Sequence, residues 1–72
     1  MKHFYIAITV TENDRHYSYI LKVSESDNLC SKLHRINGLQ TANIFSTKKK
    51  AAEVVERWNA NYKLNGKYMF NN

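Results

Sequence analysis

The chain has 72 residues, a formal net charge of +5, one cysteine and no proline, and its aromatic residues are three Phe, five Tyr and one Trp. A domain of this size buries only about 60 % of the surface of its unfolded chain, so the aromatic side chains must form much of the core. Little room remains for a deep catalytic cleft, and a lone cysteine excludes an internal disulfide and a cysteine-based zinc cluster. These observations favour a single domain, residues 1–72, that is a binding protein rather than an enzyme and has no metal or cofactor.

The N-terminal residues alternate between polar and apolar instead of forming a continuous apolar segment. No secretory signal peptide is therefore expected, and no apolar run is long enough to span a bilayer. Together with the single Cys30, these features predict a cytoplasmic protein without membrane contact.

The charge is unevenly distributed along the chain. Residues 1–30 carry three basic and four acidic side chains, whereas residues 31–72 carry eight basic and two acidic ones. The net charges of the two parts are therefore −1 and +6. This asymmetry predicts an anionic partner for the C-terminal part, either nucleic acid or an acidic protein surface.

Two segments near the N-terminus alternate with the period of a β-strand. Residues 3–11 and 17–24 flank a polar loop of five residues, 12–16, and together they predict a β-hairpin. One face of this hairpin is strongly apolar and consists of Phe4, Ile6, Ile8, Val10, Tyr17, Tyr19, Leu21 and Val23. The opposite, outer face consists of Tyr5, Ala7, Thr9, Ser18, Ile20 and Lys22.

Residues 25–38 change to a helical pattern. Ser26 or Asp27 is a suitable N-cap, and three apolar residues follow on one helical face, namely Leu29, Leu33 and Ile36. Residues 37–38, Asn-Gly, are a typical helix stop because Gly adopts the left-handed conformation without strain. A short helix of two turns is predicted, with a structured loop as the alternative.

A third strand, residues 39–45, is expected next, with Ala42 and Ile44 on one side and Asn43 and Phe45 on the other. The length of the connection predicts that this strand returns beside the first one and antiparallel to it. The sheet order is therefore expected to be 2-1-3. An open sheet of three strands needs a cover for its apolar face.

Residues 47–64 are predicted to form a long amphipathic helix that provides this cover. The apolar stripe consists of Ala51, Val54, Val55, Trp58 and Tyr62. Residues 65–66, Asn-Gly, end the helix, and residues 68–70 fold back as a short edge strand or a hydrophobic clip. The predicted fold is α+β: a three-stranded antiparallel sheet covered by one long C-terminal helix, with a short helix between strands 2 and 3 (ββαβα).

The best candidate site is the start of the long helix. Ser46 and Thr47 precede Lys48–Lys50, and free backbone N–H groups together with lysines form a plausible anion site. Additional phosphate contacts are expected from Arg35, Lys63 and Lys67. In the alternative interpretation, Thr47 merely caps the helix and the lysines extend into solvent, one of them paired with Glu53.

The outer face of the hairpin is a second candidate surface. A two-stranded ribbon can enter the major groove of DNA, but this face has a single cation, Lys22, and few side chains that read bases. Protein contact or homodimerisation through Tyr5 and Ile20 is therefore favoured over DNA for this face.

The remaining chemically distinctive residues indicate no active site. His3, His16 and His34 fall in separate elements, which argues against a metal site. Cys30 and His34 have the spacing of a nucleophile and base on a helix, but nothing orients them, so Cys30 is expected to be a small buried residue. Trp58 is expected to be core or sheet cover, and the alternative is a stacking platform for a base.

Residues 44–53 include the pattern Phe-x-Thr-Lys-Lys-x-Ala, where a strand leads into a helix. This segment resembles the strand-to-helix junction of the arm-type N-terminal DNA-binding domains of tyrosine integrases, which have a three-stranded sheet and a C-terminal helix. In that family a basic face of the sheet contacts DNA, whereas the first two strands here are nearly uncharged there, and residues 25–38 are an insertion. The resemblance implies a DNA partner without placing it on particular strand residues.

The chain is similar to short uncharacterised proteins from mobile elements of Gram-positive gut bacteria in residues 47–51, in Trp58-Asn59 and in residues 65–70. This resemblance implies a mobile-element or phage context, in which small proteins are often DNA-binding accessory factors or stoichiometric inhibitors of host defence proteins. Two functions are therefore predicted. The first is a non-enzymatic accessory or regulatory protein associated with nucleic acid, and the alternative is a protein-binding module such as an inhibitor of a host nucleic-acid enzyme.

Overall fold

The computed structural model describes residues 2–13, 15–62 and 70–71 of the chain. The elements in chain order are β1 (His3–Glu12), β2 (Arg15–Ser24), α1 (Leu29–His34), β3 (Leu39–Phe45), α2 (Lys48–Tyr62) and β4 (Phe70–Asn71). Within these residues the predicted α+β fold and its ββαβα element order are confirmed, and β4 follows as a further short strand.

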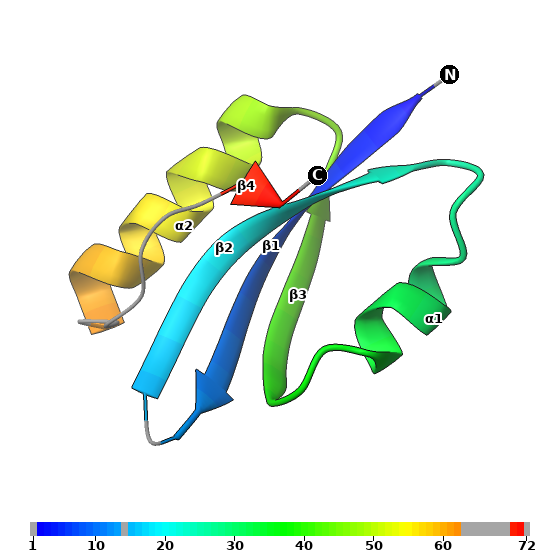
Figure 1. Cartoon of the computed structure of the whole chain (residues 1–72). Helices are drawn as coiled ribbons and strands as arrows, with labels where there is room; N and C mark the ends of the chain where they lie inside the picture. Colours follow the sequence, from blue (N-terminus) through cyan, green and yellow to red (C-terminus); the bar gives the residue numbers. More distant parts are fainter. Residues whose placement is uncertain (1, 14, 63–69, 72) are drawn as a thin grey trace.

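The sheet has the order β3-β1-β2-β4 (Figure 1). β1 is the central strand and pairs in antiparallel fashion with both β2 and β3, which confirms the predicted 2-1-3 order. β4 pairs in parallel with β2, with Phe70 opposite Ile20. Residue 70 thus belongs to an edge strand, as in one of the two predicted alternatives, whereas residues 68 and 69 lie outside the described residues.

The β1–β2 hairpin is tighter than the five-residue loop that the sequence predicts. The strands remain paired up to Glu12 and Arg15, so the predicted bounds of the loop, residues 12–16, are wrong. Asn13 follows β1 with a φ of 51°, in the left-handed region that short hairpin loops require. Asn tolerates this conformation better than most residues with a side chain, which allows the turn to be short.

The predicted short helix exists as α1, but its cap differs from both predicted residues. The side chain of Asn28 accepts a hydrogen bond of 3.0 Å from the backbone N–H of Ser31. Asp27 instead accepts a bond of 2.7 Å from the backbone N–H of Ser24 and forms an ion pair of 3.3 Å with Lys32. The Asp27 carboxylate therefore closes the turn that precedes the helix and is not available as its cap.

Gly38 connects α1 to β3 and has the left-handed φ of 74° that the sequence predicts. Its carbonyl oxygen accepts a hydrogen bond of 2.9 Å from the backbone N–H of Thr11. A Cβ atom at position 38 would collide with the carbonyl oxygen of Thr11. Glycine is thus required here both by backbone conformation and by the close approach of β1.

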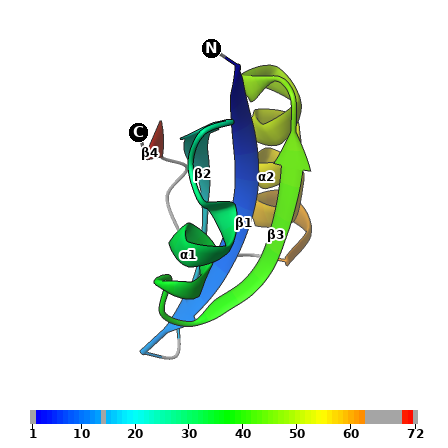
Figure 2. The same ribbon diagram turned by 90° about the vertical axis from the view of Figure 1, so that its right-hand side faces the viewer.

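The two helices cover opposite faces of the sheet (Figure 2). α2 packs on the face of Ala7 and Ile20, where these two side chains, Ala51 and Val55 are fully buried. The other face includes the buried Ile6, Ile8, Val10 and Val23, and among the described residues its cover is the much shorter α1 with its flanking loops.

The expectation that the long helix covers the more apolar face of the hairpin is therefore wrong. Ile6, Ala7 and Ile8 are consecutive and all fully buried, so the central strand is apolar on both sides. The alternation of polar and apolar residues in such a strand does not indicate which face of the sheet each helix covers. The small side chains of Ala7 and Ser18 lie beneath α2, where they leave room for a helix to approach the sheet closely.

A buried polar contact fixes α2 on this face. Ser18 on β2 is fully buried, and its hydroxyl donates a hydrogen bond of 2.6 Å to the side-chain oxygen of Asn59. Since a buried hydroxyl without a partner costs about 1–3 kcal/mol, this bond specifies how the C-terminal half of α2 sits over β2.

Candidate functional site

The start of α2 has the capped and basic character that the sequence predicts. The Thr47 hydroxyl accepts a hydrogen bond of 3.3 Å from the backbone N–H of Lys50, so Thr47 is the N-cap. Ser46 and Lys48–Lys50 are all exposed, and the first turn contains no acidic residue. Three ammonium groups therefore surround a helix end that already carries a partial positive charge.

The three lysines do not point in one direction, because consecutive helical residues are about 100° apart. Contacts farther along α2 show how the helix is oriented over the sheet. Asn59 is hydrogen-bonded to Ser18 on β2, whereas Trp58 lies toward β1 and β3. Lys50 precedes Trp58 by eight residues, which places it about 80° around the helix from Trp58, on the flank of α2 toward β3. The ammonium groups thus fan out around the helix start rather than converge on one point.

One further basic residue, Lys22, lies near the same end of the sheet. Tyr5 pairs with Lys22 on one side and with Phe45 on the other, and the chain enters α2 directly after Phe45. Lys22 is half-buried on the face that α2 covers. This register places Lys22 at the end of the sheet where α2 begins.

Arg35 does not join this group, although the sequence suggests that it does. It is the C-cap of α1 and lines a pocket with Glu12 and Tyr17, at the hairpin end of the opposite sheet face. Lys63 and Lys67, the two other predicted phosphate contacts, lie outside the described residues.

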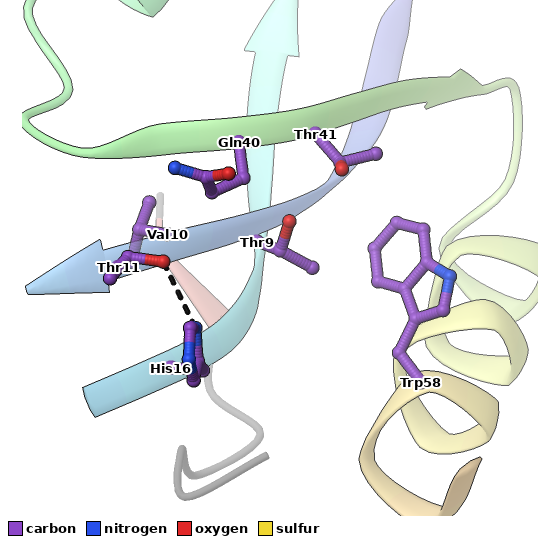
Figure 3. Close-up of a pocket in the computed structure, with 7 residues that line it drawn as sticks. All are labelled: Thr9, Val10, Thr11, His16, Gln40, Thr41 and Trp58. Carbon is purple, nitrogen blue, oxygen red and sulfur yellow. Dashed lines mark hydrogen bonds between the residues drawn. The ribbon is translucent and has the colours of Figure 1, made fainter. Parts of the chain in front are cut away.

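A small pocket lies between α2 and the sheet, at the hairpin end (Figure 3). Its volume is about 200 Å³, and it is lined by Thr9, Val10, Thr11, His16, Gln40, Thr41 and Trp58. Figure 3 shows the indole of Trp58 on one side and polar side chains of three strands on the other. The hydroxyl of Thr11 and Nδ1 of His16 are 3.0 Å apart and share a hydrogen bond.

Most of the residues lining this pocket are not found by the sequence analysis. Thr9 and Thr41 lie opposite each other on neighbouring strands, and a register shift between Thr9 and Val10 leaves Gln40 without a paired residue on β1. Such a β-bulge re-aims side chains at the edge of a sheet and has no clear signal in the sequence. Trp58 packs against the core under α2, as predicted, and in addition forms the wall of the pocket.

The outer hairpin face that the sequence assigns to protein contact is not open. Ile20 is fully buried beneath α2, and Tyr5 is half-buried against the same cluster. The expected exposure of these residues is therefore wrong, because α2 occupies this face.

Apolar surface is exposed instead on the α1 side of the sheet. Ile44 has 54 % of its surface exposed and lines a pocket of about 230 Å³ together with Phe4, Val23 and Leu29. Two acidic residues, Glu25 and Asp27, also line this pocket. The hydrogen bond from Ser24 N–H and the Lys32 ammonium lower the pKa of Asp27.

Cys30 is exposed on α1, so the expectation of a buried cysteine is wrong. The apolar side of α1 is formed by Leu29 and Leu33, and Cys30 lies one position around the helix from Leu29. His34 is exposed as well. Among the described residues, no three His, Cys, Asp or Glu side chains form a group suited to a metal ion.

Comparisons of the chain with family models, with curated proteins and with solved structures give no match. Of the helices in the described part of the chain, none combines the length and apolar character needed to cross a bilayer.

Proposed function

We propose that this protein is a non-enzymatic binding module that associates with nucleic acid through the start of α2. The observation that supports this proposal is the exposed run Lys48–Lys50 in the first turn of a helix capped by Thr47, with no acidic residue in that turn. Lysines at a helix N-terminus disfavour the helix slightly, and an anionic partner reverses this effect.

A polyanion suits this arrangement better than a single small anion. The ammonium groups fan out from one turn, so they reach different phosphates along a strand rather than one phosphate together. Phosphate contacts of this kind give affinity and position without reading sequence. The chain is expected to bind nucleic acid with little base preference at the lysines themselves.

The test is a titration of labelled DNA, as duplex and as single strand, at two or more salt concentrations. The logarithm of the binding constant is expected to fall with the logarithm of salt concentration, by about 0.9 for each neutralised phosphate of a duplex and about 0.7 for a single strand. The double variant Lys49→Gln/Lys50→Gln should flatten this slope by up to two such increments.

The matched control is Lys32→Gln/Arg35→Gln, on and next to α1. Both double variants lower the formal net charge by two, so a general charge effect acts equally on them. If the interface is at the start of α2, the α2 variant should lose much more affinity for DNA than the control. Equal losses, or no binding of the unmodified protein at low salt, would contradict the proposal.

A second candidate function is supported by the exposure of Ile44 beside the pocket of Phe4, Val23 and Leu29. An exposed apolar residue next to a pocket is suited to protein contact, as in an inhibitor that binds a host nucleic-acid enzyme. Ile44→Asp is expected to abolish capture of such a partner from a host lysate. Asn43→Asp, the neighbouring exposed position on the opposite face of β3, is the control and should leave capture unchanged.

A further inference from the structure

We infer that the pocket beside Trp58 receives one unpaired nucleobase, so that the protein prefers single-stranded to duplex nucleic acid. This inference rests on the proposed association with nucleic acid and adds a second contact to it. The lysines hold the phosphates, and the pocket holds a base of the same strand.

The walls of the pocket have the chemistry that a base requires. Trp58 is half-buried and lines the pocket with its indole, so a base stacks on the part of the ring that remains accessible; such stacking tolerates any base because every base has a π-face. Thr9, Thr41 and Gln40 stand opposite it and carry hydroxyl and amide groups that both donate and accept hydrogen bonds (Figure 3). The edge of a base carries the same two kinds of group.

The size of the pocket limits what enters it. Its volume of about 200 Å³ is smaller than the roughly 300–1,000 Å³ of pockets that enclose whole drug-sized ligands. A single ring system therefore enters, while the attached sugar and phosphate stay outside. The phosphates then remain within reach of cations on the protein surface.

Cations lie along α2 on the side of Trp58. Lys50, Val54 and Trp58 form a row at a spacing of four residues that turns by about 80° from end to end, on the flank of α2 toward β3, and the exposed Arg57 lies next to this row. Lys50 and Trp58 are about 12 Å apart along the helix axis. At about 3.4 Å per stacked nucleotide, a strand of three to four nucleotides spans this distance.

The cations beside the pocket favour a nucleic acid as its ligand over a neutral sugar, although a sugar can also stack on an indole. Lys50 and Arg57 have no role toward an uncharged ligand, whereas they match the phosphates of a strand whose base occupies the pocket. A base within a duplex is covered on both faces and reaches such a pocket only after it is unstacked. The pocket is therefore expected to select single strands.

The test uses the intrinsic fluorescence of Trp58, which is the sole tryptophan of the chain. Three probes are titrated: a short oligothymidylate, an abasic strand of the same length and a blunt duplex. The oligothymidylate is expected to change the Trp58 emission and to bind roughly tenfold more tightly than the abasic strand. The abasic strand should bind through its phosphates without changing the emission.

Variants of exposed pocket residues make the test independent of core packing. Gln40→Ala and Thr41→Val keep the fold, since both positions are exposed, and they should reduce the preference for oligothymidylate over the abasic strand. Asn43→Ala, exposed on the same strand but outside the pocket, is the matched control and should leave it unchanged. Trp58→Leu should remove the preference.

The outcomes separate this inference from the proposed function. Equal affinity for the two single strands, with unchanged emission and a steep salt dependence, would overturn the base pocket and leave the lysine interface in place. An emission change with a neutral oligosaccharide but not with oligothymidylate would also overturn it. Failure of every strand to bind at low salt would overturn both.

Discussion

The two faces of this sheet are covered in very different ways. On one face, a helix of 15 residues fully buries Ala51 and Val55 against the sheet. On the other, a helix of six residues has no buried residue and leaves Ile44 exposed beside a pocket. The large side chains of the strands are buried on both faces, so the difference lies in the helices: α2 contributes fully buried residues of its own, whereas α1 contributes none and leaves apolar surface available for contact.

The largest expected effect comes from truncating a side chain that α2 buries, and a side chain on α1 is the comparison. Ile20→Ala beneath α2 should lower the free energy of unfolding by about 2–5 kcal/mol, because it leaves a cavity at a fully buried position. Leu33→Ala on α1 should cost much less, since Leu33 is only half-buried. Urea denaturation of both variants measures the difference, and equal losses would break the comparison.

The connection from α1 to β3 is expected to be the next most sensitive position. Gly38→Ala should destabilise the protein by about 1–3 kcal/mol or more, because φ is 74° and the added Cβ meets the Thr11 carbonyl. Asn13→Gly is the control, with a positive φ but a residue type that tolerates it, and its effect should stay within about 0.5 kcal/mol. Thermal unfolding of the two variants gives the ranking, and a mild effect of Gly38→Ala would show that the α1 side is loosely anchored.

The hydrogen bond between Ser18 and Asn59 contributes to the stability of the α2 side. Asn59→Ala should cost about 1–2 kcal/mol, because it leaves the fully buried Ser18 hydroxyl without its partner at 2.6 Å. The Ser18→Ala/Asn59→Ala double variant should be less destabilised than the sum of the two single variants. Strict additivity in this cycle would mean that the hydrogen bond does not hold α2 in place.

The smallest effect is expected from Asp27, on the α1 side. Hydrogen bonding and Lys32 lower the pKa of its carboxyl below the ordinary value of 3.8. Because the pKa of this carboxyl is lower in the folded than in the unfolded chain, its ionised form stabilises the fold at pH values above 3.8. This contribution is lost as the pH falls from 3.8 through the lower pKa of the folded state. Asp27→Asn should therefore weaken the acid dependence of unfolding slightly, as followed by denaturation at neutral pH and near pH 3; an unchanged pH dependence would contradict the role of this turn.

The strands and their order could be predicted from the sequence because alternation and turn residues are local signals. The bounds of β3, Leu39–Phe45, are one example, and the stripe residues Ala51, Val54, Val55 and Trp58 of α2 are another, whereas the side chain of Tyr62 lies outside the described part of the structure. The face that α2 covers could not be predicted, since Ile6, Ala7 and Ile8 are buried on both sides of the central strand.

The cap of α1 was ambiguous because three consecutive residues, 26–28, are all suitable N-caps, and the choice depends on where the Asp27 carboxylate finds a donor.

The lysines at the start of α2 and the pocket beside Trp58 also differ in how far the sequence predicts them. Lys48–Lys50 are adjacent in sequence, so their common location at one helix start is predictable. The pocket combines Thr9, Gln40 and Trp58 from three elements, and it depends on a bulge and on the position of α2. Tertiary packing, rather than any local pattern, brings these residues together.

The most direct test of the central claim is the salt dependence of single-strand binding for the two charge-matched variants. We expect Lys49→Gln/Lys50→Gln, at the start of α2, to lower the slope by up to about 1.4, whereas Lys32→Gln/Arg35→Gln should leave it nearly unchanged. Equal slopes for the two variants would contradict an interface at the start of α2.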